Sequence, residues 1–110
     1  MAFNKQYALV GVGTSEVTSV PYTGAYYVDA KIQVPRLAAG ATAASQCVCT
    51  VTNVTQSTTL FTSAAGADGV YVDFNANAND VIRVALTSSA PVDQVLNNSV
   101  KAEIDLGSGQ

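Results

Sequence analysis

A regular alternation of apolar and polar side chains in AYYVDAKIQVP, residues 25 to 35, constrains the fold of this chain most strongly. One face collects apolar side chains: Tyr26, Val28, Ala30, Ile32 and Val34. The other face carries Tyr27, Asp29, Lys31 and Gln33. Successive side chains of a strand point to opposite faces, so this period of two predicts a half-buried β-strand. Pro35 should end the strand, because proline has no N–H to donate to a neighbouring strand.

Seven further segments predict strands, separated by residues typical of turns. Three alternate as clearly as the first: 70 to 75, 80 to 88 and 99 to 107. Four are weaker: 6 to 11, 15 to 20, 46 to 54 and 57 to 63. Strands that recur every ~8 to 12 residues are typical of sandwiches and barrels. The sequence therefore predicts one all-β domain over residues 1–110, an antiparallel two-sheet β-sandwich, jelly-roll-like, with about eight short strands.

The connecting segments carry weaker predictions. Residues 37 to 44 are alanine-rich but are interrupted by Gly40, so we expect a loop there. Residues 89 to 98 favour either a helical turn or an extended connection. The short polar start, residues 1 to 6, is expected to be an arm that orders on docking, and residues 107 to 110 a loose tail.

Cys47 and Cys49 are the only cysteines, and the chain has no histidine. A disulfide between them would close a very small ring and distort the strand. A metal site needs three or four ligands, which are lacking unless subunits share one. A catalytic thiol lacks its usual histidine base. We therefore expect two reduced cysteines on the core face of a strand, which implies folding in a cytosol.

The charge balance disfavours two classes of partner. The net charge is −3, and five scattered basic residues form no patch for phosphates, so we expect no nucleic-acid binding. No apolar run approaches the ~20 residues that span a bilayer, so we expect no membrane partner. The start of the chain lacks the apolar region of a signal peptide. We expect the protein to stay in the compartment that makes it, or to leave inside a larger particle.

Candidate catalytic and metal-binding groups have simpler interpretations. Without histidine there is no Ser-His-Asp triad. Glu103 and Asp105 share a strand face and could serve acid–base chemistry, but a solvated face explains them better. An oxygen-rich group suits calcium, although turn formation is the preferred reading. Its members are Asp68, Asp73, Asn75, Asn77, Asn79 and Asp80. The expectation is no enzyme, no cofactor and no metal.

Two tyrosines, Tyr27 and Tyr71, are predicted to point outward from strands. Outward aromatic rings suit either stacking on a sugar or a protein–protein contact. With Phe3, Asn4 and Lys5 of the expected arm, they form the predicted interface.

The second half of the chain, residues 62 to 109, contains a recognisable series of features. A strand that ends in a glycine turn is followed by Asn-Asp-Val-Ile-Arg-Val, a Thr-Ser-Ser step, Asp-x-x-x-Asn and a final Val-Lys-x-x-Ile strand. The upstream Gly-Ala-Tyr-Tyr-Val-Asp-Ala-Lys-Ile-Gln-Val-Pro looks like the matching first half. This pattern resembles small all-β structural proteins of tailed bacteriophages, most of all head decoration (cement) proteins. The strand entry also resembles TNF-like and bacterial carbohydrate-binding sandwiches.

The resemblance implies a non-enzymatic virion protein with no catalytic residues. Such a protein would bind the major capsid protein on the outside of a capsid and stabilise it as an oligomer, with a homotrimer favoured and a dimer as the alternative. It would be made in the host cytoplasm and reside on the capsid surface.

Three other functions remain open at this stage. One is a tail or fibre module that binds host-surface carbohydrate through exposed aromatic rings. Another is a tail-tube, neck or head-completion subunit. A hydrolase that works through carboxylates alone is the third.

Overall fold

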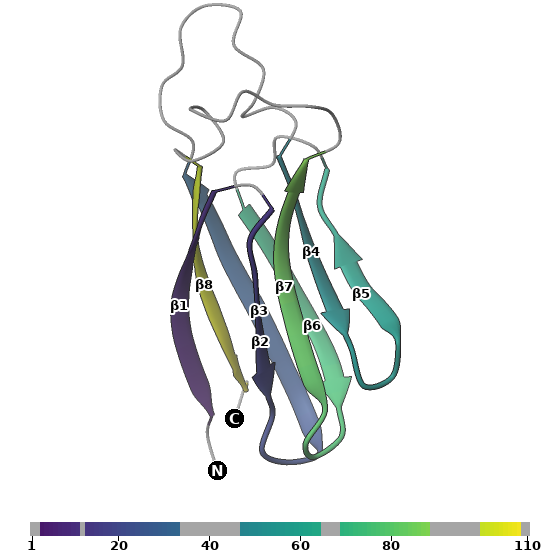
Figure 1. Ribbon diagram of the computed structural model, residues 1–110. Coiled ribbons are helices and arrows are strands. Elements are labelled where there is room, and N and C mark those ends of the chain that lie inside the picture. The colour runs from purple at the N-terminus through teal and green to yellow at the C-terminus, as the bar shows by residue number, and fades with distance from the viewer. Residues whose placement is uncertain (1–2, 12, 34–46, 65–68, 89–99, 109–110) are drawn as a thin grey trace, which may run out of the picture.

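The computed structural model describes residues 3–11, 13–33, 47–64, 69–88 and 100–108, and these form strands and turns (Figure 1). The eight strands are β1 (Asn4–Val10), β2 (Ser15–Ser19), β3 (Gly24–Gln33), β4 (Cys47–Asn53), β5 (Thr58–Thr62), β6 (Gly69–Ala76), β7 (Val81–Ser88) and β8 (Lys101–Ser108). Their number and order confirm the prediction. Within these described ranges, no helix has the length and apolar character needed to cross a membrane.

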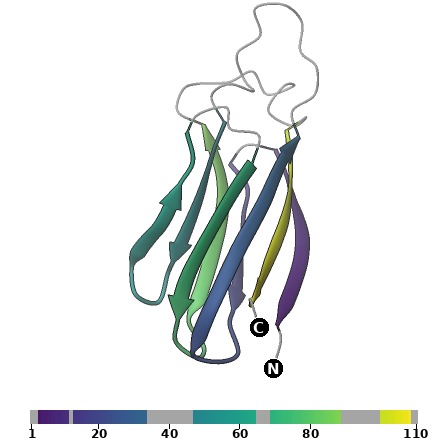
Figure 2. The same ribbon diagram turned by 180° about the vertical axis from the view of Figure 1, so that it is seen from behind.

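The strands form two antiparallel sheets of four that pack face to face (Figures 1 and 2). One sheet has the order β1-β8-β3-β6, and the other has the order β2-β7-β4-β5. Apart from the β4–β5 hairpin, consecutive strands lie in different sheets. This order is that of a jelly roll, so the predicted fold class is confirmed.

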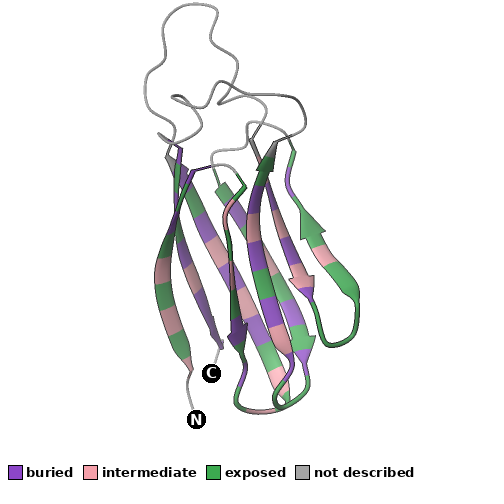
Figure 3. Cartoon of the chain, viewed as in Figure 1, coloured by how far each residue is buried: buried purple, intermediate pink, exposed green. Residues whose placement is uncertain are grey.

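The core lies between the sheets and follows the predicted alternation (Figure 3). The buried apolar side chains of β3, β7 and β8 are Tyr26, Val28, Ala30, Ile32, Ile82, Val84, Leu86, Ala102, Ile104 and Leu106. Each large aliphatic side chain contributes about 1.5–3 kcal/mol when fully buried. Cys49 is buried in the same core, as predicted for it. Val34, Pro35 and the Cys47 side chain lie outside the described residues.

Aromatic rings fill one end of this core. Tyr26, 2% exposed, packs against Tyr22, Phe74 and Phe3 with ring centroids 5.4, 6.0 and 6.1 Å apart. The Tyr26 hydroxyl donates to the Tyr22 carbonyl oxygen and accepts from the Tyr22 N–H. These two hydrogen bonds hold the turn between β2 and β3. One tyrosine thus satisfies its polar group while its ring fills the core.

The turns that follow β2, β4 and β6 lie at the same end of the sandwich, at the bottom of Figure 1. A buried carboxylate, that of Asp80, joins them. Asp80, 4% exposed, accepts hydrogen bonds at Oδ2 from Asn53 Nδ2 (3.0 Å), Gln56 Nε2 (2.7 Å) and the Asn77 N–H (3.0 Å). Asn53 Oδ1 in turn accepts from the Gln56 N–H. These hydrogen bonds hold the pKa of Asp80 below its ordinary value despite burial. The bond from Asn53 has the largest effect, and the bond from Asn77 has the next largest.

Two buried hydroxyls on facing edge strands have no such partners. The hydroxyl of Tyr7 on β1 and that of Thr18 on β2 are buried without a hydrogen-bond partner among the described residues. Burial raises the pKa of Tyr7 far above its ordinary value, and the nearby Glu16 carboxylate adds to the effect. The open side of the sandwich between β1 and β2 therefore contains polar groups that lack partners.

Glycines turn the chain between β1 and β2. Gly11 and Gly13 have φ angles of 91° and 93°, in the left-handed region that favours glycine. The Gly11 N–H donates to the Val100 carbonyl oxygen, and the Gly13 N–H donates to that of Leu86.

Parts of the predicted arm and tail belong to strands. Residues 4 to 6 belong to β1, where Asn4 pairs with Gly107 and Gln6 with Asp105. Gly107 and Ser108, expected in the tail, are buried in β8. Ser108 also donates its N–H to the Phe3 carbonyl oxygen and accepts from the Phe3 N–H at Oγ. Residues 1–2 and 109–110, and the predictions for 37–44 and 89–98, lie outside the described residues.

Candidate functional site

The outer face of the β1-β8-β3-β6 sheet carries most of the charged side chains that the structure describes, and we call it the Tyr/Asp face. Strand register orders these side chains in rows across the sheet. One row runs Asn4, Gly107, Tyr27 and Asp73, and the next runs Gln6, Asp105, Asp29 and Tyr71. A third contains Ala8, Glu103, Lys31 and Gly69, and Val10 and Lys101 follow. Polar positions of four strands are thus gathered on one surface.

Tyr27 and Tyr71 form a stacked pair on this face. Their ring centroids are 5.9 Å apart, and the ring planes differ by 11°. Tyr71 is 59% exposed, and its hydroxyl donates to Asp73 Oδ1 at 3.3 Å. The pair presents an aromatic surface with carboxylates beside it, which suits hydroxyl-rich or cationic groups.

Asp105 is held by neighbours on both sides. Asn4 Nδ2 donates to its Oδ1 at 2.5 Å, and the Tyr27 hydroxyl donates to its Oδ2 at 3.4 Å. These contacts fit over β8 because the next residue of β8 on this face is Gly107, which has no side chain. A Cβ atom there would lie 2.9 Å from the Tyr27 hydroxyl oxygen and from the Phe3 carbonyl oxygen.

A hollow of about 550 Å³ lies beside this network, over β1, β8 and β3. Asp29, Lys31, Glu103 and Asp105 are among its lining residues. Asp29 and Asp105 stand directly opposite each other on adjacent strands, a position in which like charges repel. The hollow therefore presents an excess of negative charge.

The five residues predicted for the interface do not all meet. Asn4, Tyr27 and Tyr71 lie on the Tyr/Asp face, and Tyr27 connects the other two through its ring and hydroxyl. Phe3 instead packs on Tyr26 in the core. Lys5 points to the other side of β1, with its ammonium group 5.9 Å from the centre of the Tyr7 ring.

Sequence reasoning missed the convergence of three carboxylates with the tyrosines. Asp29, Asp73 and Asp105 each occupy a predicted outward position, but only strand register places them next to one another. The expected sharing of one face by Glu103 and Asp105 is confirmed, and Glu103 lies 4.0 Å from the Lys101 ammonium group. The residues that lie opposite Glu103 and Asp105 on β3, Lys31 and Asp29, were not predicted.

The oxygen-rich group that suggested calcium is divided by the fold. Asp73 and Asn75 point outward on β6, whereas Asp80 is buried and hydrogen-bonded between turns. Asn79 occupies a turn with φ of 73°, in line with the preferred reading of these residues as turn formers. Asp68 is outside the described residues. In the described part of the chain, no three histidine, cysteine or acidic side chains are grouped as metal ligands.

The outer face of the β2-β7-β4-β5 sheet is chemically different, and we call it the Thr/Val face. Its residues are Ser15, Val17, Ser19, Val48, Thr50, Thr52, Thr59, Thr62, Val81, Arg83, Ala85 and Thr87. Arg83 is the single charged side chain among these described residues. Val17 is 51% exposed at the edge of the face.

The chain matches no model of a known protein family, and no curated protein matches it. The two outer faces therefore have to be interpreted from their own chemistry.

Proposed function

We propose that this chain is a non-enzymatic structural protein of a tailed-phage virion that binds the outside of the capsid as an oligomer and stabilises it. The proposal rests on the likeness of the sequence to decoration proteins and on the physical character of the folded surface. A shell accessory protein has to be a rigid body with a wide contact area, because its role is to bury area across neighbouring subunits.

The Thr/Val face is the observation that supports this proposal most strongly. It offers four adjacent strands of small and β-branched side chains with one charge among the described residues. Depletion of charged residues is a feature of the central part of protein–protein contact surfaces. A rigid sandwich with such a face is suited to packing against neighbouring molecules.

We propose that residues 3–5, at the start of β1, contact the capsid, because they belong to the interface predicted from the sequence. The peptide groups of Phe3 are hydrogen-bonded to Ser108, so this end is part of the rigid body. Lys5 is half-buried, and the rest of its side chain is accessible to a partner.

The decisive experiment uses phage heads with and without this protein. Mass spectrometry of purified virions should find it in hundreds of copies for a head protein, and in a handful for a tail or fibre protein. Heads from a deletion phage should lose resistance to heat and chelator, and the purified chain should restore it. Normal resistance in the deletion heads, or a low copy number, would exclude the decoration role.

Docking through β1 can be tested in the same restoration assay. Lys5→Glu should weaken binding to deletion heads. Lys101→Glu changes the net charge equally, from −3 to −5, but lies at the far end of the Tyr/Asp face. Equal binding by the two variants would rule out this assignment of the capsid contact.

The Tyr27–Tyr71 pair favours a second candidate function, the binding of host-surface carbohydrate by a tail or fibre module. Aromatic rings can pack on sugar rings, while Asp29, Asp73 and Asp105 offer hydrogen-bond acceptors for sugar hydroxyls. The hollow of about 550 Å³ beside them falls within the ~300–1,000 Å³ range of small-molecule sites.

A glycan array followed by calorimetric titration of any hit would test this candidate. Tyr27→Ala and Tyr71→Ala should each abolish the binding. Phe61→Ala is the matched control, because Phe61 is an exposed aromatic residue of β5 in the other sheet. No glycan hit, or a hit that both tyrosine variants retain, would exclude carbohydrate binding at this face.

A further inference from the structure

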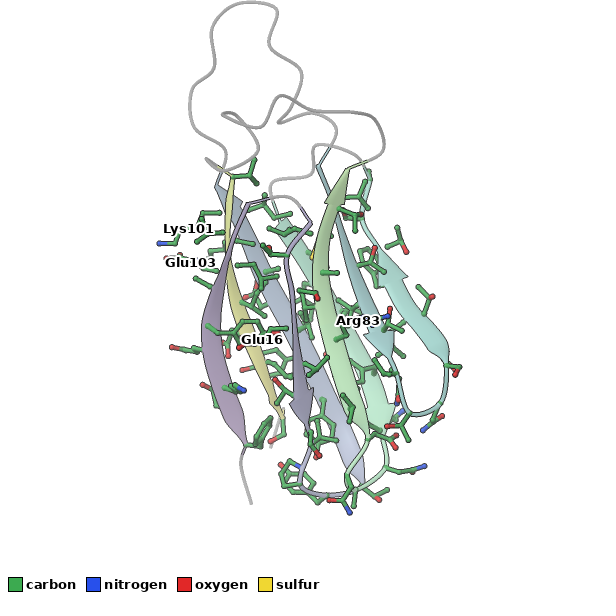
Figure 4. All side chains as sticks on the ribbon, in the orientation of Figure 1. Glu16, Arg83, Lys101 and Glu103 are labelled. Atoms are coloured by element: carbon green, nitrogen blue, oxygen red, sulfur yellow. The ribbon has the colours of Figure 1, made fainter. Side chains whose placement is uncertain are left out.

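Arg83 occupies an isolated position on the Thr/Val face. It is exposed in β7, opposite Val17 of β2 and Thr52 of β4. Within the described residues, it has no hydrogen bond or ion pair. Figure 4 shows Arg83 on one sheet, and Lys101 and Glu103 on the other. A guanidinium group is weakly hydrated and binds carboxylates and aromatic rings, so it is well suited to an interface.

The hollow on the opposite side of the molecule has the complementary charge. Asp29 and Asp105 face each other there, with Glu103 in the next row. The Asp29 carboxylate has no hydrogen bond or ion pair to the described residues. Tyr71 is the register partner of Asp29, so its exposed ring stands beside the hollow. A cation at this point would relieve the repulsion between the two carboxylates and would have an aromatic ring next to it.

We propose that the Thr/Val face of one copy of this chain packs on the Tyr/Asp face of a second copy, with Arg83 entering the hollow between Asp29 and Asp105. The charges of the two faces support this pairing. The Tyr/Asp face carries four carboxylates and two ammonium groups, whereas the Thr/Val face carries one guanidinium group among its described residues. The inference rests on the oligomer of the proposed function and names the two surfaces through which its copies would associate.

The available area is sufficient for a specific contact. Four strands spaced ~4.8 Å apart, each with about six residues in the contact at ~3.3 Å per residue, cover roughly 400 Å² in projection. The accessible area of side chains exceeds the projection, so two copies would bury roughly 1,000 Å², at the lower limit of specific interfaces. The expected association is therefore modest and depends on protein concentration.

The contact joins two different surfaces, so each copy can use both. Such heterologous contacts close into rings or continue as open chains, whereas a two-fold dimer requires one self-complementary patch. The proposal therefore predicts assemblies that grow beyond two copies.

Sedimentation velocity of the purified chain, over about a hundred-fold range of concentration, tests the proposal by mass action. The mean mass should rise with concentration, and added salt should lower it. Arg83→Glu should weaken association about tenfold or more, because it places a carboxylate against two others. Lys101→Glu is the matched control: it alters the net charge equally but makes the Tyr/Asp face more acidic, so it should not weaken association.

A charge exchange tests the specific pairing. Asp29→Arg alone should weaken association, and the double variant Arg83→Glu with Asp29→Arg should recover most of it. Circular dichroism and thermal melting confirm that each variant is folded. A chain that stays monomeric throughout, a closed dimer, an Arg83→Glu variant that associates normally, or a folded double variant without recovery would each overturn the proposal. Binding to phage heads is measured separately in the restoration assay, so failure of this self-contact and failure of capsid binding can be told apart.

Discussion

Polar groups are buried at two places in this sandwich, and the two places are arranged in opposite ways. At the turn end, the Asp80 carboxylate accepts hydrogen bonds from three residues, Asn53, Gln56 and Asn77. On the β1–β2 side, the hydroxyls of Tyr7 and Thr18 have no partner in the part of the chain that the structure describes. Because an unpartnered buried polar group costs about 1–3 kcal/mol, the first place should stabilise the fold and the second should weaken it.

The two places differ in whether hydrogen bonds connect neighbouring parts of the fold. The Asp80 network joins the β4–β5 turn to the β6–β7 turn, and backbone bonds from Val20 and Asn79 add the β2–β3 turn. The edge strands β1 and β2 lack such a connection at Tyr7 and Thr18. We expect local opening to begin on the β1–β2 side.

The largest effect should come from Asn53→Ala. This change removes a donor from the buried Asp80 carboxylate and the acceptor of the Gln56 N–H, so the free energy of unfolding should fall by about 2–3 kcal/mol. Urea denaturation measures the loss, with Thr58→Ala in the exposed start of β5 as the control. A loss no larger than that of the control would show that the network does not stabilise the turns.

Acid should produce the next effect. The folded-state pKa of Asp80 is below its ordinary value of 3.8, so its contribution to stability is complete above that value. It is lost as the pH falls through the lower, folded-state pKa. Urea midpoints measured across this range should show less acid dependence in Asp80→Asn than in the native chain. Asp73→Asn, on the exposed outer face, should keep the native dependence, and the same loss in both variants would contradict the assignment.

A gain is expected from Thr18→Val. The substitution keeps the branched shape, since Val differs by a methyl group in place of the hydroxyl, and it removes a buried oxygen without a partner. The free energy of unfolding should rise by about 1 kcal/mol. Ser19→Val, at the adjacent exposed position of β2, controls for strand propensity. Destabilisation by Thr18→Val would mean that the hydroxyl has a partner in solution, such as a bound water molecule.

The smallest effect should be that of Tyr7→Phe. The ring and its packing stay, and an oxygen without a partner is removed. Because the residue is only half-buried, the free energy of unfolding should rise by about 0.5 kcal/mol. Hydrogen exchange of the β1 amides would show whether the change also slows opening of this edge. Faster exchange in the variant would reverse the interpretation of Tyr7.

Much of the fold could be predicted because alternation is a local property. In β3 and β8, each inward and outward position follows from a period of two and is found as expected where it is described. The predicted strands began at residue 6 and ended at residue 107, and they missed residues 4, 5 and 108 because these lack the apolar alternation that marks a strand. Lys5 is polar but points to the inner side of β1, at the edge of the sheet. Gly107 is needed because a Cβ atom there would lie too close to Phe3 and Tyr27.

The site could be predicted only in part, since pairing between strands is not local. The outward direction of Tyr27 and Tyr71 was readable from their own strands. Their contact, and the opposition of Asp29 to Asp105, depend on how β3 aligns with β6 and β8. These strands are separated by tens of residues in the chain, so no short motif specifies their alignment.

The position of β8 has a consequence for how the molecule forms. It follows the other seven strands in the chain, yet it lies between β1 and β3 and pairs with both. Until it has been synthesised, the unpaired edges of β1 and β3 remain available to other chains. Contacts such as Asn4 with Gly107 span nearly the whole sequence, which predicts slow folding and a period of vulnerability to aggregation.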